Sequence, residues 1–251
     1  MDDDAAPGPS SARLDELLLI ANELRRLGVA ALVDERVPPD PRSRVTHGQC
    51  IEALIATILL GTHTLYSIGE VLEPYDLELT FGWPGATADH FHDVRVAAAM
   101  DALFEAGIVP VSSAALVRAV QVHELDLGRL HLDTTSVAVY GQYSLSEEPA
   151  HPDDPQAIPH VTRGHSKDKR GDLKQIVYGV SVTADSAVPT FGRAASGNRA
   201  DVQETRFILQ QLSEVLPEPR GTTLVGDSKF FSGETLVLAQ RHGMHVVTML
   251  P

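Results

Sequence analysis

Two aspartates, Asp133 and Asp227, are the residues whose type and setting in the sequence best suit chemistry. Asp133 lies within an apolar run at 129–143, and Asp227 ends a second apolar run at 222–227. An acid in an apolar strand costs desolvation free energy unless it is paired or binds a cation. If the two strands are neighbours in one sheet, both carboxylates reach the same edge, where they suit Mg²⁺ or Mn²⁺. Two such ions, about 3.5–4 Å apart, support phosphodiester chemistry. The alternative is that both aspartates only cap turns.

A second candidate is the basic segment 163–174, which carries five cationic residues against Asp168 and Asp172, a local net charge of +3. Lysine and arginine supply most side-chain contacts to phosphates, so if a polyanion such as DNA binds this chain, we expect it to touch this segment, near the carboxylates. The alternative is an ordinary solvated charge run. The candidate DNA-binding residues are Arg163, Lys167, Lys169, Arg170 and Lys174.

Other residues that could do chemistry have simpler interpretations. His90 and His92 lack a second ligand pair at zinc spacing, so we expect a pair on a helix surface. Cys50 lies on an apolar helical stripe, which is typical of a core thiol. His131 shares a strand face with Asp133, and we expect an ordinary strand histidine there. The sequence has no glycine-rich phosphate loop and no Gly-x-Ser-x-Gly motif, which argues against nucleotide-binding and hydrolase functions.

The elements that must position these residues fall into two groups. Apolar residues recur at helical spacing from Ser11 to Gly28, and a second helix begins after Thr46 and ends at Gly61. Shorter helical patterns follow at 64–72, 88–106 and 113–122. These patterns predict an all-helical N-terminal domain over residues 12–127, preceded by a disordered lead-in over residues 1–11.

The period of the apolar pattern changes from 3.6 to 2 near Gly128. Asp201 and Glu204 have the spacing of a capping box that opens a helix between the third and fourth strands. Helices that connect strands in this way predict a mixed β-sheet domain with flanking helices, and hence an α+β protein. The expected strands are at 129–143, 175–184, 188–194, 222–227 and 245–250, with helices after Asp201 and at 233–242.

Charge and composition restrict the partners of the chain. Residues 1–128 hold 8 Lys and Arg against 20 Asp and Glu, whereas residues 129–251 hold 12 against 14, and the whole chain of 251 residues has a net charge of −14. A DNA-binding domain usually has a basic surface, so we expect the acidic helical domain to pack against protein and not to be the main DNA-binding surface. The alternative is that this domain recognises the ends of a DNA element.

With one cysteine the chain forms no intrachain disulfide. Its longest apolar stretch, at 53–60, is far below the roughly 20 residues of a membrane span. We therefore expect a cytoplasmic protein with no membrane partner.

Five sequence blocks, in this order, resemble the DDE-type transposases of bacterial insertion sequences. The most specific block matches the pattern Gly-[Tyr/His]-Ser-Lys-Asp-x-Arg-x-Asp-Leu-Lys-Gln, and the helical front of the chain is also similar to the N-terminal domain of that family. The resemblance extends over nearly all of residues 14–251. The blocks are LHLDTTSVAVYGQY (130–143), GHSKDKRGDLKQIVYGVSVT (164–183), GNRADVQE (197–204), LVGDSKF (224–230) and HVVTMLP (245–251).

This resemblance implies an RNase H-like catalytic domain over residues 128–251, in which two aspartates and one glutamate hold Mg²⁺ or Mn²⁺ for DNA cleavage and strand transfer. Asp133 and Asp227 match the first two acids. In the family the glutamate comes from a helix after the last core strand, and the sequence stops at Pro251, so we expect a partial domain, truncated before the third acid. The implied protein is a DNA transposase whose present chain is catalytically deficient.

The resemblance also implies the partners. They are DNA, as both insertion-sequence ends and target, together with a second copy of the chain or a full-length transposase. The alternative to an active enzyme is a non-catalytic remnant that binds DNA or a partner and regulates or inhibits the full-length transposase.

Overall fold

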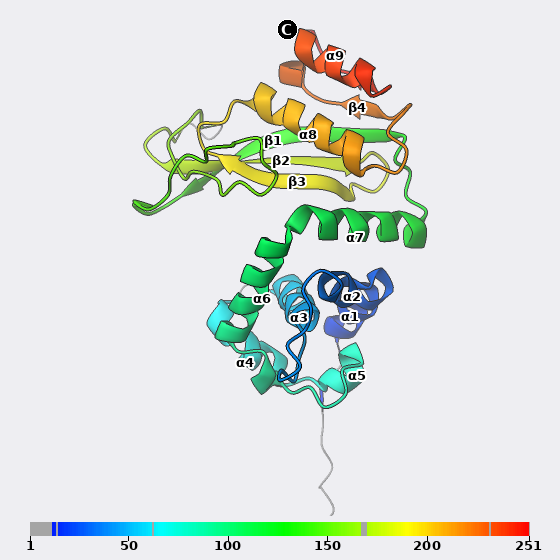
Figure 1. Ribbon diagram of the computed structural model, residues 1–251, viewed down its shortest axis with the longest axis vertical. Coiled ribbons are helices and arrows are strands. Elements are labelled where there is room, and N and C mark those ends of the chain that lie inside the picture. The colour runs from blue at the N-terminus through cyan, green and yellow to red at the C-terminus, as the bar shows by residue number, and fades with distance from the viewer. Residues whose placement is uncertain (1–11, 14, 62, 167–169, 231, 251) are drawn as a thin grey trace, which may run out of the picture. The chain divides into compact units, whose positions relative to one another are not determined.

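The computed structural model describes residues 12–250, except residues 14, 62, 167–169 and 231 (Figure 1). The chain divides into two compact units, Met1–Val111 and Ser112–Pro251. The division falls within helix α7 (Ile108–His123), whereas the sequence analysis put the domain boundary after this helix, between residues 127 and 128. The expected lead-in over residues 1–11 lies outside the described residues.

The first unit is helical, as the sequence predicts, and two of its helix ends confirm the expected local chemistry. Helix α1 ends at Gly28, which has a left-handed φ of 69°. Helix α3 begins with a capping box, in which the Thr46 side chain accepts from the Gln49 backbone and the Gln49 side chain accepts from the Thr46 backbone. The helices are α1 (Glu16–Leu27), α2 (Val29–Asp34), α3 (His47–Leu60), α4 (Ile68–Leu72), α5 (Leu77–Phe81) and α6 (Asp93–Ala106), with 3₁₀ turns η1 (Leu65–Ser67) and η2 (Ala88–His90).

One hydrophobic core holds this unit together. Leu17 of α1, Cys50 of α3 and Val96 of α6 are completely buried in it. Phe91 is also completely buried and stacks on Trp83, with 5.4 Å between the ring centroids. Helices α2 and α5 contribute to the same core but were not predicted, since each is too short to show a clear period.

The second unit contains a mixed sheet in the strand order β3-β2-β1-β4-β5. The first three strands are antiparallel neighbours, and β4 and β5 are added in parallel to β1. This is the RNase H-like arrangement of the expected α+β fold. The strands are β1 (Arg129–Val139), β2 (Lys174–Thr183), β3 (Pro189–Ser196), β4 (Thr223–Val225) and β5 (His245–Val247); the helices after β3 and β4 are α8 (Asp201–Val215) and α9 (Gly233–Arg241), with the 3₁₀ turn η3 (Ser228–Phe230).

Helix α8 packs along β1, β2 and β3 and buries one face of the sheet (Figure 1). Leu130, Leu132 and Thr134 of β1 lie on this buried face. Asp133, one residue out of step with them, faces the exposed side. The sequence analysis treated Asp133 as an acid in a buried strand. The alternation along β1 instead gives its carboxylate access to water, which removes most of the expected desolvation cost.

No single helix among the described residues has the length and apolarity to cross a membrane. Two bent pairs, α3 with η1 and α4, and α6 with α7, meet those criteria only when each pair is counted together.

Candidate functional site

The parallel pairing of β1 with β4 brings the two predicted metal ligands together. The paired stretch ends at His131 in β1 and Val225 in β4. Asp133 and Asp227 each lie two residues beyond that pair. They follow neighbouring strands, which a sheet holds about 4.8 Å apart. Both aspartates line one open cavity of about 330 Å³, which also takes in His131. The expected convergence of the two carboxylates at one edge of the sheet is therefore present.

Backbone hydrogen bonds orient each carboxylate. The backbone N–H of Thr134 donates to Oδ1 of Asp133 at 2.7 Å, and the backbone N–H of Lys229 donates to Oδ1 of Asp227 at 2.9 Å. The hydroxyl of Thr248 donates to the backbone carbonyl of Asp227 and ties that residue to the chain beyond β5. Because the donors are backbone N–H groups one and two residues further along the chain, both carboxylates have a fixed direction.

A third carboxylate, that of Asp201, reaches the same edge from the first turn of α8. One of its oxygens accepts a hydrogen bond from the hydroxyl of Thr134 at 2.9 Å, and the other forms an ion pair with the ammonium of Lys229. The hydrogen bond with Asp201 raises the pKa of Lys229, although burial acts in the opposite direction. The charges of Asp201, Asp227 and Asp133 raise this pKa further. The ammonium therefore lies within the field of all three acids.

This arrangement corrects the predicted capping box. The N-cap of α8 is Ala200, which has no side chain that could cap, and Asp201 uses its carboxylate on Thr134 and Lys229. Glu204 is equally unavailable as a cap, because Arg193 binds both of its oxygens. A local motif was the wrong interpretation because the partners of both acids come from distant strands and turns.

The donor set at this edge suits one kind of metal site. Within the described part of the chain, no three His, Cys, Asp or Glu side chains form a group that could enclose a metal ion. Mg²⁺, however, keeps several waters and commonly binds one or two carboxylates together with phosphate oxygens. Two oriented, water-accessible carboxylates in an open cavity thus fit an ion that is shared with a phosphate-bearing substrate. They do not fit a closed structural metal centre.

The basic segment lies elsewhere on the sheet. Lys174 pairs with Val139, six residues along β1 from Asp133, which corresponds to about 20 Å of strand. Thr162, at the other end of the segment, bridges to Gln175, so both ends of the segment are held at this end of β2. We expected the basic segment to lie close to the carboxylates, but the register of β1 with β2 anchors both of its ends far from Asp133. A role in DNA binding stays a prediction, for phosphates several nucleotides from the carboxylates.

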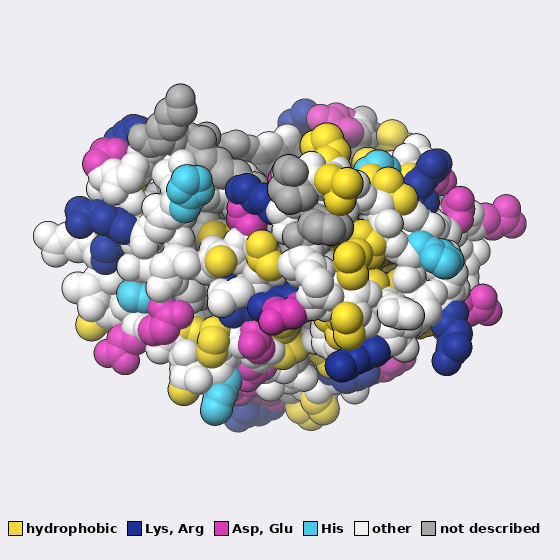
Figure 2. Space-filling view, turned by 90° about the horizontal axis from the view of Figure 1, so that it is seen from above, with side chains coloured by type: hydrophobic (Ala, Val, Ile, Leu, Met, Phe, Trp, Pro, Cys, Tyr) yellow, Lys and Arg dark blue, Asp and Glu magenta, His cyan; other side chains and the backbone are white. Residues whose placement is uncertain are grey.

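The individual cations of the segment differ in their surroundings. Arg170 is held by Asp172 through two hydrogen bonds of 2.7 and 2.8 Å, and Lys174 donates to the backbone carbonyl of Gln142 at 2.5 Å. Arg163 is exposed, and Lys167 and Lys169 lie outside the described residues. On the face drawn in Figure 2, basic and acidic side chains are interspersed, so that the described side chains of this face form no single basic patch.

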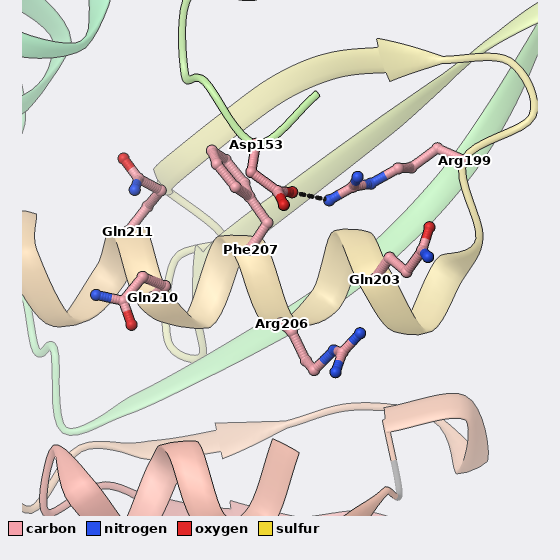
Figure 3. Close-up of a pocket in the computed structure, with 7 residues that line it drawn as sticks. All are labelled: Asp153, Arg199, Gln203, Arg206, Phe207, Gln210 and Gln211. Carbon is pink, nitrogen blue, oxygen red and sulfur yellow. Dashed lines mark hydrogen bonds and ion pairs between the residues drawn. The ribbon is translucent and has the colours of Figure 1, made fainter. Parts of the chain in front are cut away.

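A polar pocket of about 460 Å³ lies along α8 (Figure 3). Arg199 and Asp153 point toward one another across it and form an ion pair. Glu204, 3.4 Å from Arg199, is completely buried and binds Arg193 through two hydrogen bonds of 2.7 Å each. The guanidinium of Arg193 also lies 3.4 Å from the ring centroid of Phe207. This buried network was missed by the sequence analysis; it fixes α8, and hence Asp201, against the sheet.

The remaining candidates have structural roles. The ring Nδ1 of His92 accepts from the backbone N–H of Arg95 at 3.2 Å as the N-cap of α6, and His90 makes a similar contact one turn earlier. Cys50 is completely buried, and burial raises the pKa of its thiol. The core thiol is thus as expected, whereas the two histidines lie in the turn η2 and at the N-cap of α6 and not on the surface of one helix.

Comparison with known proteins adds the following findings. A family model described as a domain of unknown function, DUF4277, matches residues 9–116, less than half of the chain. No curated protein matches the sequence. Among solved structures, the chain is similar to a piggyBac transposase synaptic complex with hairpin DNA, with 12% identity, a TM-score of 0.36, and coverage of 100% of this chain and 45% of the other.

Two structures of Mos1 transposase are also similar. A pre-cleavage transpososome matches with 10% identity and a TM-score of 0.31, over 84% of this chain and 61% of the other. A paired-end complex with the left transposon end matches with 11% identity and a TM-score of 0.29, over 82% and 59%. The chain thus spans less than two thirds of the length of each of these three proteins.

Proposed function

We propose that the chain is a transposase-like protein that binds DNA and holds Mg²⁺ or Mn²⁺ between Asp133 and Asp227. The observation that carries this proposal is the convergence of these two aspartates, far apart in the sequence, in one cavity at the edge of β1 and β4. Both lie in sequence blocks that resemble the acid motifs of DDE-type transposases. Two oriented carboxylates next to solvent favour a large phosphodiester substrate over an enclosed small molecule.

The residues of the site have separate tasks under this proposal. Asp133 and Asp227 would hold the cation, and the backbone N–H groups of Thr134 and Lys229 would keep their carboxylates directed at it. When bound, the cation supplies charge stabilisation at the reacting phosphate and lowers the pKa of a water molecule. The exposed face of β1 leaves room for DNA to approach the site, and the basic segment 163–174 would contact its backbone at a distance.

Binding of Mn²⁺ tests the proposal without relying on turnover. Free Mn²⁺ is measured by electron paramagnetic resonance in the presence of the chain and of DNA that carries the ends of the element. We expect Asp133→Asn and Asp227→Asn each to weaken binding at least about tenfold, since each removes one of two charged ligands. Asp185→Asn, in the β2–β3 turn, is the matched control and should bind as the wild type does. Equal binding by all four proteins would contradict the proposal.

A second candidate function is a DNA- or partner-binding protein that does not cut and that inhibits an active transposase. It is favoured by the finding that the described residues offer no group of three metal-ligating side chains. A nicking assay with Mn²⁺ separates the two functions. Cleavage that is lost in Asp133→Asn supports the enzyme, whereas binding of Mn²⁺ and DNA without cleavage supports the inhibitor.

A further inference from the structure

Lys229 is a cation beside the candidate metal site, two residues after Asp227 in the turn η3. Its ammonium forms an ion pair with Asp201, which the hydroxyl of Thr134 binds from the other side at 2.9 Å. Asp201 is therefore held at both oxygens, and it holds the lysine where the charges of Asp227 and Asp133 also act on it.

The charge balance of this edge suggests what the ammonium does. Asp133, Asp201 and Asp227 bring three negative charges, and such an edge repels the phosphates of DNA. One divalent cation and one ammonium together neutralise these three charges. The lysine is thus the part of the required positive charge that the protein itself provides.

The ammonium is also accessible. The side chain of Lys229 is 45% exposed, whereas that of Asp201 is 20% exposed. An ammonium has three N–H donors, and the ion pair with Asp201 accounts for one direction only. The other directions include the solvent side from which DNA would approach.

We propose that Lys229 contacts a DNA phosphate beside the metal site and that Asp201 is the residue that positions it. This inference rests on the proposed function, because it requires DNA to bind at the Asp133 and Asp227 edge. It assigns a DNA contact outside the basic segment 163–174, and it gives Asp201 a role that its place at the start of α8 did not suggest.

The test is Lys229→Met, which keeps most of the side-chain volume, compared with Lys229→Arg. Loss of one phosphate contact should weaken DNA binding about fivefold and lower the slope of log K against log salt by about one. Removal of the positive charge should at the same time tighten binding of Mn²⁺ in the absence of DNA, by roughly twofold to fivefold. Lys229→Arg should behave as the wild type in both measurements. Opposite changes in the two affinities are not expected of a residue that only supports the fold.

The double variant Lys229→Met with Asp201→Asn distinguishes a phosphate contact from simple neutralisation of Asp201. If the lysine only neutralises Asp201, the double variant regains wild-type DNA affinity, and the inference is overturned. If the lysine contacts phosphate, DNA binding stays weak. Wild-type DNA affinity in Lys229→Met also overturns the inference but leaves the proposed function intact, whereas a wild-type chain that binds neither Mn²⁺ nor DNA removes both.

Discussion

The buried ion pair between Glu204 and Arg193 predicts a large loss of stability when one charge is removed. The Glu204 side chain is completely buried and the Arg193 side chain is 9% exposed, and two hydrogen bonds of 2.7 Å join them. Arg199 lies 3.4 Å from the same carboxylate. Glu204→Gln preserves the volume but leaves the guanidinium of Arg193 without its counter-charge, whereas Arg199 keeps its ion pair with Asp153. Breaking a buried pair in this way costs about 3–5 kcal/mol, and we expect a loss within that range.

Urea unfolding measures this loss, and the chain has a built-in control. Far-ultraviolet circular dichroism follows the unfolding of both units, whereas the fluorescence of Trp83, the only tryptophan, reports on the helical unit alone. We expect Glu204→Gln to shift the first signal and to leave the second unchanged. Arg193→Met should cost a similar amount, and the double variant should lie below the sum of the two by about 2 kcal/mol, since the residues act as one unit. Strict additivity, or a loss below about 1 kcal/mol for Glu204→Gln, would refute the reasoning.

Three further predictions concern single residues of the fold. Burial raises the pKa of Glu52 from 4.5 to about 7, so the contribution of this side chain to stability is full below about pH 4.5 and is lost as the pH rises to 7. Glu52→Gln should therefore stabilise the helical unit by about 3 kcal/mol at pH 8. Urea titrations of this variant should also show a weaker dependence of stability on pH. Gly179→Ala would place a Cβ 2.5 Å from Cδ1 of Ile208, so thermal unfolding should show a loss of about 1–3 kcal/mol as α8 is pushed from the sheet. Thr46→Ala removes the cap of α3 and should cost about 1 kcal/mol, whereas Thr46→Ser should restore it.

Local chemistry made much of the fold predictable. The end of α1 at Gly28 and the start of α3 after Thr46 depend on residues within a few positions of each helix end. The alternation of the strands identified β1, β2 and β3, and short connections through helices predicted a mixed sheet. The convergence of Asp133 and Asp227 followed from one further condition, that β1 and β4 are neighbours.

The parts that were not predicted depend on pairing between distant segments. Asp201 and Glu204 have the spacing of a cap, but their partners come from strands and turns that the spacing does not reveal. The distance between the basic segment and Asp133 depends on the register of β1 with β2, in which Lys174 pairs with Val139. Register is set by the whole sheet and its turns, so charge alone placed this segment too close to the carboxylates.

The most direct test of the central claim is a crystal of the chain grown with Mn²⁺ and measured for anomalous scattering. We predict a peak between the carboxylates of Asp133 and Asp227, in the cavity at the edge of β1 and β4. A crystal of Asp133→Asn, grown and measured in the same way, should lack this anomalous peak. A wild-type crystal at saturating Mn²⁺ with no peak at these carboxylates, or with its strongest peak elsewhere, would contradict the account.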